Sequence, residues 1–357
     1  MRFFGLSLMI LVLTGCTIFH SIREDNMEPG YQYAKGNKDK LLISSATGLA
    51  DLNNDLELTK QHIMPVFSMT KTITAIAILQ LLERGQLKLE DSINSWIKTP
   101  YPDEVTIKHL ITHTSGIANP IPLKWVYLPE SSVLFDENNE LKKLMSESHK
   151  LKSQPGSKYR YSNLGYWLAG KVIEKVSNKS YQTYIEENVL SPLKLSNDQV
   201  SFTINESKIA KGYLNRLSAM GVIAPFLLDE GLLTSINWSW AEVRAIYVFG
   251  PSYGGIFSTA EGMLTILQDL LKDQSTLLND KSKTLLFSQQ KNSKGQSLKM
   301  TFGWHTATNK GRQYLFKEGG GAGYHSEMRI YPKEKLASVI IANRTSYDVS
   351  GKLTQLD

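Results

Sequence analysis

The 357-residue chain contains a single cysteine, Cys16, so it can form neither an intrachain disulfide nor a metal site built from several cysteines. It lacks a basic block of the kind that binds nucleic acid, although its 40 lysine and arginine residues outnumber its 34 acidic ones. Apolar residues make up 41% and aromatic residues 10% of the chain, which excludes a disordered or low-complexity protein. The composition predicts an ordinary globular protein that does not bind nucleic acid.

A long hydrophobic run is also missing at the start of the chain. The apolar run at residues 3–14 is shorter than the roughly 20 residues that a membrane-spanning helix needs. It follows one positive residue, Arg2, and precedes Gly15 and Cys16, an order typical of a secretory signal. The stretch Leu-Thr-Gly-Cys that ends at Cys16 resembles the lipobox of bacterial lipoprotein signals, in which the cysteine is lipidated after cleavage.

We therefore expect residues 1–15 to be a lipoprotein signal peptide, Cys16 to carry the lipid and residues 16–40 to form a polar tether. The alternative is a cleaved signal with an incidental cysteine. A lipid anchor implies a membrane-bound protein on the periplasmic or extracytoplasmic side of a bacterial envelope. Thr17 follows the cysteine where inner-membrane retention uses aspartate, which favours the outer membrane in a cell that has one.

Hydrophobic patterns predict strands at both ends of the remaining chain and helices between them. Strand patterns occupy residues 41–45, 63–67, 303–306, 314–316, 327–331 and 337–341, and helix patterns residues 105–112, 166–176, 181–190 and 259–271. This order predicts an α+β fold, an antiparallel β-sheet flanked by helices and built from both chain ends. We expect one composite domain at residues 41–357, with an inserted, mostly helical lobe at about residues 86–245.

Residues 218–228 (SAMGVIAPFLL) form a conspicuously apolar stretch. Such a stretch is usually a buried helix or part of the core, and we expect that here. The alternative is the wall or lip of a substrate pocket.

A serine three residues before a lysine on a helix brings the amine within reach of the hydroxyl. The pattern occurs four times, at Ser68/Lys71, Ser95/Lys98, Ser191/Lys194 and Ser288/Lys291. Only Ser68 stands where an extended apolar segment meets a long apolar helix. Its backbone N–H there would help to bind an oxyanion. The alternative is that Ser68 only caps the helix.

Two later motifs favour the catalytic interpretation. Tyr161-Ser162-Asn163 lies in PGSKYRYSNLGY, and Lys317-Glu318-Gly319 precedes a glycine-rich stretch and a strand. With Phe67-Ser68-Met69-Thr70-Lys71, the chain resembles the serine β-lactamase and penicillin-binding-protein superfamily, in the branch of class C β-lactamases, esterases and D-alanyl-D-alanine peptidases. The resemblance covers about residues 41–343 and rests on three motifs in the family's order.

The resemblance implies an acyl-transfer site in which Ser68 is the nucleophile. Lys71 acts as base only if burial and a neighbouring cation lower its pKa, and Lys317 is the candidate cation. Tyr161 would relay the proton to the leaving group, and Asn163 would orient Lys71 and the substrate.

The third motif would contribute the substrate-binding residues Lys317, Glu318, Gly319 and Gly320. The backbone N–H groups of Ser68 and Gly320 would form the oxyanion hole. Glu318 departs from the family, because penicillin-recognising relatives place a hydroxyl there that contacts the substrate carboxylate. A carboxylate repels that group unless it turns away, so Glu318 favours uncharged esters or amides.

Two further features receive structural interpretations. His109 and His113 have the spacing of a zinc-binding helix, but Leu110 replaces the glutamate of a metalloprotease, so we expect His113 to be structural. We expect the glycine-rich residues 319–323 to let the backbone approach a substrate closely.

The sequence thus predicts a lipid-anchored serine hydrolase without metal or organic cofactor, whose substrate is a small molecule or peptide with an ester or amide bond. The alternative is a non-catalytic envelope lipoprotein that keeps the fold to bind a peptide or a partner. The ionisable residues of all three motifs are present, which favours the enzyme.

Overall fold

The computed structural model describes residues 28–120, 125–228 and 231–357. The predicted signal peptide, Cys16 and the first part of the predicted tether lie outside the described residues. Within the described part of the chain, no helix is both long and apolar enough to cross a bilayer.

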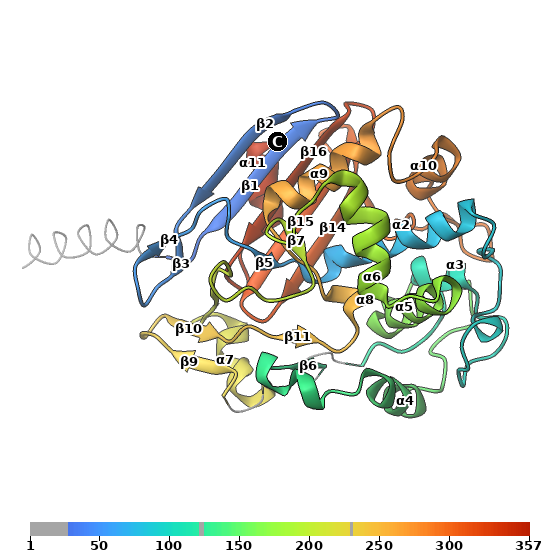
Figure 1. Ribbon diagram of the computed structural model, residues 1–357, viewed down its shortest axis with the longest axis horizontal. Helices are drawn as coiled ribbons and strands as arrows, with labels where there is room; N and C mark the ends of the chain where they lie inside the picture. Colours follow the sequence, from blue (N-terminus) through green and yellow to red (C-terminus); the bar gives the residue numbers. More distant parts are fainter. Residues whose placement is uncertain (1–27, 121–124, 229–230) are drawn as a thin grey trace, which may run out of the picture.

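The centre of the fold is a six-stranded sheet in the order β13-β14-β15-β16-β1-β2, with antiparallel pairing throughout (Figure 1). Its strands are β1 (Tyr31–Asn37), β2 (Leu41–Thr47), β13 (His305–Asn309), β14 (Arg312–Gly321), β15 (Tyr324–Tyr331) and β16 (Leu336–Ala342). β1 pairs along its whole length with β16, from Tyr31 opposite Ala342 to Asn37 opposite Leu336. The prediction of an α+β fold with an antiparallel sheet built from both chain ends is confirmed.

The predicted end of the tether at residue 40 is wrong, because β1 lies inside the range assigned to it and forms an inner strand of the sheet. The folded domain therefore begins before residue 41. The error has a physical cause: β1 is covered on both faces, so its sequence YQYAKGN lacks a clear alternation of apolar and polar residues. Ala34 packs into the main core, whereas Tyr33 packs on the opposite face.

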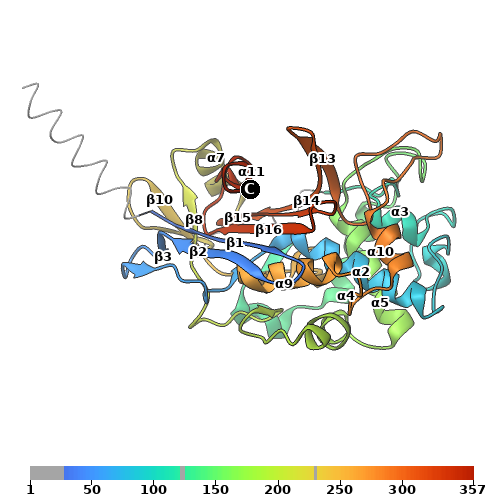
Figure 2. The ribbon, with the colours of Figure 1, turned by 90° about the horizontal axis from the view of Figure 1, so that it is seen from above.

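Helices cover the two faces of the sheet unequally (Figure 2). One face packs against α9 (Ala260–Leu271) and α2 (Thr70–Glu83), and Val339 and Ile341 of β16 point into this main core. The other face carries α11 (Val349–Leu356), which packs on the alternate residues Ile340 and Ala342. α2 is buried around its whole circumference, so the segment that follows Ser68 is fixed inside the protein.

The inserted lobe contains helices and also a small sheet in the order β8-β10-β9. The remaining helices are α3 (Ile107–Ile111), α4 (Glu137–Glu147), α5 (Asn163–Ser177), α6 (Tyr181–Ile185), α7 (Ala219–Leu227), α8 (Pro251–Gly254) and α10 (Asp280–Phe287). Short 3-10 turns are η1 (Phe67–Met69), η2 (Ile93–Ser95), η4 (Pro129–Leu134) and η6 (Ser191–Leu193), and η5 (Glu186–Leu190) is a π-helical turn. The short strands are β3 (Leu49–Asp51), β4 (Leu56–Glu57), β5 (Met64–Pro65), β6 (Val126–Tyr127), β7 (Val200–Ser201), β8 (Gly212–Asn215), β9 (Leu233–Ser235), β10 (Trp240–Val243), β11 (Tyr247–Val248) and β12 (Phe257–Ser258).

The apolar stretch at residues 218–228 forms α7, but most of its large side chains are exposed. Val222 is 62% and Phe226 86% exposed, whereas Ala224 is buried in a small cluster with Leu214 of β8 and Val243 of β10, against which Leu228 packs. The prediction of a buried helix is therefore wrong. A single short helix lying on a three-stranded sheet has one covered face, and nothing in the described chain covers the other.

Candidate active site

Ser68 lies in η1, between β5 and the buried helix α2. The preceding residue, Phe67, has a φ of 41°, a left-handed conformation that costs a non-glycine residue about 1–2 kcal/mol. Ser68 does not cap α2: the capping position is Met69, and the Ser68 hydroxyl bonds instead to two side chains. The capping interpretation is wrong, and the strained turn presents the hydroxyl to its neighbours.

Those neighbours are the predicted base and proton relay. The Lys71 amine donates to Ser68 Oγ over 3.0 Å, and the Tyr161 hydroxyl and Ser68 Oγ are hydrogen-bonded at 2.6 Å. A second bond of 2.7 Å from Lys71 Nζ to the Tyr253 carbonyl fixes the amine. The structure thus brings together the three residues that the sequence assigned to catalysis.

Lys71 is fully buried, and no ion pair joins it to an acidic group within the described residues. Burial, and secondly the charge of Lys317, hold the pKa of the Lys71 amine well below its usual range. The rings of Tyr161, Tyr166 and Tyr253 surround Nζ at 5.0, 5.7 and 5.5 Å from their centroids. Burial and the charge of Lys317 favour the neutral amine, which a general base requires, whereas the ring faces would stabilise the ammonium.

Lys317, on β14, is the second buried amine of the site. Burial lowers its pKa to about 7, and the charge of Glu318 acts in the opposite direction. Its Nζ lies 5.0 Å from the centroid of the Tyr161 ring and has no hydrogen-bond partner within the described residues. A buried amine without a partner is costly, so Lys317 is available to bind an electronegative group of a substrate.

Glu318 does not belong to the site, and its assignment as a substrate-binding residue is wrong. Successive residues of a strand face opposite sides of the sheet; Lys317 is buried, whereas Glu318 is exposed. Glu318 stands opposite Glu327 of β15. That face carries α11, to which Arg329 of β15 donates hydrogen bonds at Ser350 and Thr354. The carboxylate therefore does not repel a substrate bound at Ser68.

The glycines after Lys317 allow β14 to approach the nucleophile segment. A Cβ on Gly319 would lie 2.0 Å from the Val66 carbonyl oxygen, and one on Gly321 would lie 2.8 Å from the Phe67 ring. The close approach that the structure shows is thus between two parts of the protein, and approach of this backbone to a substrate stays a prediction. Gly320 is exposed and lines the same cavity as Ser68. This position is compatible with the oxyanion hole, which stays a prediction.

Asn163 begins α5, where Ser162 caps the helix by accepting from the Gly165 N–H. Asn163 lines the cavity beside Ser68, and its buried Oδ1 has no partner within the described residues. The hydrogen bonds of Lys71 go to Ser68 and Tyr253, not to Asn163. Of its two predicted roles, only contact with the substrate agrees with this position.

His113 is buried and contacts two residues of the second motif, Tyr161 and Ser162. Its ring centroid is 4.4 Å from that of Tyr161, and its Nδ1 accepts from the Ser162 N–H at 3.1 Å. Burial first, then the charges of Lys317 and Lys71, hold its pKa well below the usual range, so the ring is neutral. These contacts fit the predicted structural role.

Sequence reasoning missed two contributors. One is Tyr253, whose backbone carbonyl holds Lys71; a backbone acceptor leaves no mark in the sequence, although the neighbouring Gly254 and Gly255 indicate a tight turn. The other is His305, whose Nε2 bonds to the Tyr159 hydroxyl at 2.9 Å. Burial and the two lysines lower the pKa of His305 to about 3, so no further cation enters the cluster at neutral pH.

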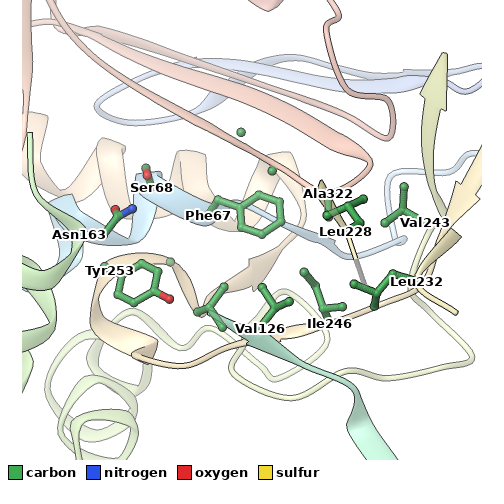
Figure 3. Close-up of a pocket in the computed structure, with 14 residues that line it drawn as sticks. Phe67, Ser68, Val126, Asn163, Leu228, Leu232, Val243, Ile246, Tyr253 and Ala322 are labelled. Atoms are coloured by element: carbon green, nitrogen blue, oxygen red, sulfur yellow. The ribbon is translucent and has the colours of Figure 1, made fainter. Parts of the chain in front are cut away.

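A cavity of about 140 Å³ opens beside Ser68 (Figure 3). Ser68 and Asn163 lie at one end, and Leu228, Leu232 and Val243 lie at the other. Leu228 directly follows α7, so the end of the apolar stretch 218–228 forms a pocket wall, the alternative that the sequence left open. No group of three or more histidine, cysteine or acidic residues that would hold a metal ion occurs among the residues the structure describes.

Together, the fold and this cluster define a class of proteins with a lysine-paired serine at the start of a buried helix, facing a lysine on a sheet strand. The chain belongs to the Beta-lactamase family, whose model matches residues 19–355.

Individual relatives agree with this assignment. The chain is 26% identical over 337 residues to penicillin-binding protein 4* of Bacillus subtilis (strain 168), covering 92% of this chain and 71% of that protein. It is 25% identical over 343 residues to protein Flp of Staphylococcus aureus (strain N315), again over 92% of this chain but only 62% of the relative. The D-amino acid amidase of Ochrobactrum anthropi SV3 has a similar structure, with a TM-score of 0.72 at 18% identity over 88% of this chain and 87% of that one.

Proposed function

We propose that the protein is a serine hydrolase that cleaves an ester or amide bond through an acyl-enzyme on Ser68. The observation that carries the proposal is the pair of hydrogen bonds at one hydroxyl: 3.0 Å from Lys71 and 2.6 Å to Tyr161. This arrangement connects a nucleophile directly to a base and to a second proton carrier. Membership of a family with hydrolase relatives agrees with it.

In the first half of the reaction, Ser68 Oγ attacks the substrate carbonyl carbon while its proton moves to the neutral Lys71 amine. The carbonyl oxygen becomes an oxyanion, which the N–H groups of Ser68 and Gly320 would stabilise. As the bond from carbon to the leaving group breaks, a proton returns from Lys71 through Tyr161 to the leaving group. The acyl group is then bonded to Ser68 Oγ.

In the second half, a water molecule attacks the acyl carbon. The bond from that carbon to Ser68 Oγ breaks, the acid is released, and the proton of water restores the Ser68 hydroxyl through Lys71. A free lysine is neutral in only about one molecule in 2,500 at pH 7. The burial of Lys71 and the nearby charge of Lys317 both favour the neutral form, so the surroundings of the base fit this cycle.

The acceptable charge of the substrate differs from the expectation based on sequence. Because Glu318 faces away, the reason for excluding a carboxylate near the third motif no longer holds. The unpartnered Lys317 amine would attract such a group when protonated. Neutral esters and amides and carboxylate-bearing peptides are therefore all compatible with this side of the site.

A fluorophosphonate probe tests the proposal, because Ser68 Oγ displaces its fluoride and becomes labelled. We expect the wild type to be labelled and Ser68→Ala to be unlabelled. Ser95→Ala is the matched control, since Ser95 also precedes a lysine by three residues but lies in η2, and it should label like the wild type. Absence of labelling by fluorophosphonates, penicillins and activated esters alike would favour the non-catalytic alternative.

We also propose that the protein is held at a bacterial membrane through lipid on Cys16. The first described residue, Glu28, pairs with Arg344, which stacks near Trp240 of β10. The chain therefore enters the domain at the end that carries β10 and the exposed apolar helix α7 (Figure 2). Cys16→Ser should abolish fatty-acid labelling and release the protein from the membrane fraction, whereas Thr17→Ser should do neither.

A further inference from the structure

We propose that the acyl part of the substrate is an apolar chain or ring that binds in the cavity beside Ser68. This inference rests on the proposed function, because it assigns a substrate class to the same nucleophile. It concerns the side of the scissile bond that stays on the enzyme in the acyl-enzyme.

The lining of the cavity is the first support. Ser68, Asn163 and Gly320 form its reactive end, and the rest of the wall consists mainly of aliphatic and aromatic side chains: Phe67, Val126, Leu228, Leu232, Val243, Ile246, Val248, Tyr253 and Ala322. Figure 3 shows Phe67 on one side of the space and Val126 and Ile246 on the other. Among the residues that the structure describes, no lysine, arginine, histidine or acidic residue lines it. A charged acyl group would lose its hydration there without a partner.

The size of the cavity is the second support. Its volume of about 140 Å³ is close to the roughly 150 Å³ of an engineered apolar cavity that binds benzene. A phenyl ring or a short alkyl chain fits such a space, whereas an acetyl group leaves most of it empty.

The position of Tyr161 shows which side of the bond this cavity serves. Tyr161 would deliver the proton to the leaving group, and it does not line the apolar cavity. It lines a separate hollow with Asn119, Lys152 and Arg160. The leaving group therefore departs toward a polar, basic surface, and the acyl group extends the other way. An apolar cavity at Ser68 and a polar hollow at its hydrogen-bond partner Tyr161 would thus select the orientation of the substrate.

A series of nitrophenyl esters of increasing acyl length tests the inference. Each buried methylene is expected to raise kcat/KM by about fourfold until the cavity is full. We expect a rise of up to about 250-fold from acetate to hexanoate, which adds four methylenes, followed by a plateau or decline at longer chains. A flat profile, or a maximum at acetate, would overturn the proposal.

Variants of Ile246, which is buried in the wall opposite Phe67, make the test specific. Ile246→Trp fills the space and should move the preference to acetate while fluorophosphonate labelling of Ser68 persists. Ile246→Ala enlarges the space and should move the optimum to longer chains; it decides the question if the tryptophan variant does not fold. The control is Val222→Trp, because Val222 lies on the exposed side of α7 and lines no cavity described above, so its profile should match the wild type.

The two proposals fail in different ways. Labelled protein with an unchanged profile in both Ile246 variants would refute the acyl cavity but leave the hydrolase intact. Unlabelled wild-type protein would refute the hydrolase itself.

Discussion

At the scale of single residues, the site depends on two buried amines, and the charge of Lys317 helps to lower the pKa of Lys71. Lys71 is hydrogen-bonded to the nucleophile, while Lys317 has no partner within the described residues. The pKa of each is lowered chiefly by burial, and the charge of Lys317 is the second cause for Lys71. The catalytic base is therefore prepared partly by a residue that approaches from the sheet.

This coupling predicts the pH dependence of acylation. Because the pKa of Lys71 is lowered, its neutral form is present above that pKa and is lost as pH falls through it. Lys317→Met removes the neighbouring cation, so the pKa of Lys71 rises and the acidic limb of the labelling rate should move to higher pH. The measurement is the rate of inactivation by a neutral fluorophosphonate from pH 4 to 9. Lys310→Met, on the exposed turn between β13 and β14, is the control; a limb that stays in place or moves to lower pH contradicts the coupling.

At the scale of elements, β14 and η1 must meet closely for Ser68 and Lys317 to share a site. Gly319 faces the backbone carbonyl of Val66, and Gly321 faces the ring of Phe67. A side chain on the strand at this point pushes the nucleophile turn away from the sheet.

Two adjacent alanine variants test this contact. Gly319→Ala puts a Cβ at 2.0 Å from a backbone oxygen and should destabilise the protein by about 2 kcal/mol or more, with slower labelling of Ser68. Gly320→Ala meets its nearest atom, His325 Cδ2, at an ordinary 3.5 Å and should unfold at nearly the wild-type urea concentration. Equal stability of the two variants would show that η1 can move away from β14 without lowering the free energy of unfolding.

The helices and strands also show how much of the secondary structure the sequence patterns predict correctly. Residues 259–271 were predicted as a helix, and α9 occupies Ala260–Leu271 after the cap Thr259. β14 was predicted only at residues 314–316 but extends to Gly321, because paired backbone groups continue the strand where glycines remove the side-chain pattern. α7 was expected to be buried, since the apolar stretch does not reveal that only one of its faces is covered.

At the scale of the whole molecule, the two ends of the chain depend on each other. β1 lies between β16, from the far end of the sequence, and β2, which follows it. Without β1, β2 has no partner in the sheet and β16 becomes an edge strand. Residues 31–37 are thus part of the fold, not of a linker.

Truncation provides the corresponding test. A chain that starts at residue 28 should fold and label at Ser68, whereas one that starts at residue 41 should show no cooperative thermal transition by circular dichroism. The two chains differ by β1 and its immediate flanks. Cooperative melting of the shorter chain would mean that the sheet tolerates the loss of an inner strand.

The sequence by itself determined the reactive groups and their order. Ser68, Lys71, Tyr161 and Lys317 were assigned from local motifs, and the structure brings all four together. Local spacing relates Ser68 to Lys71 alone, whereas Tyr161 and Lys317 were assigned because their motifs resemble those of the family.

Only the tertiary structure decided what surrounds those groups. The face taken by Glu318, the carbonyl of Tyr253 that holds Lys71, the inner position of β1 and the apolar cavity all depend on segments far apart in sequence. A strand's pattern gives the alternation of its side chains, but which face is buried depends on the register and on the elements packed against it. Burial and neighbouring charge, which set the pKa of the catalytic base, exist only once those elements have assembled.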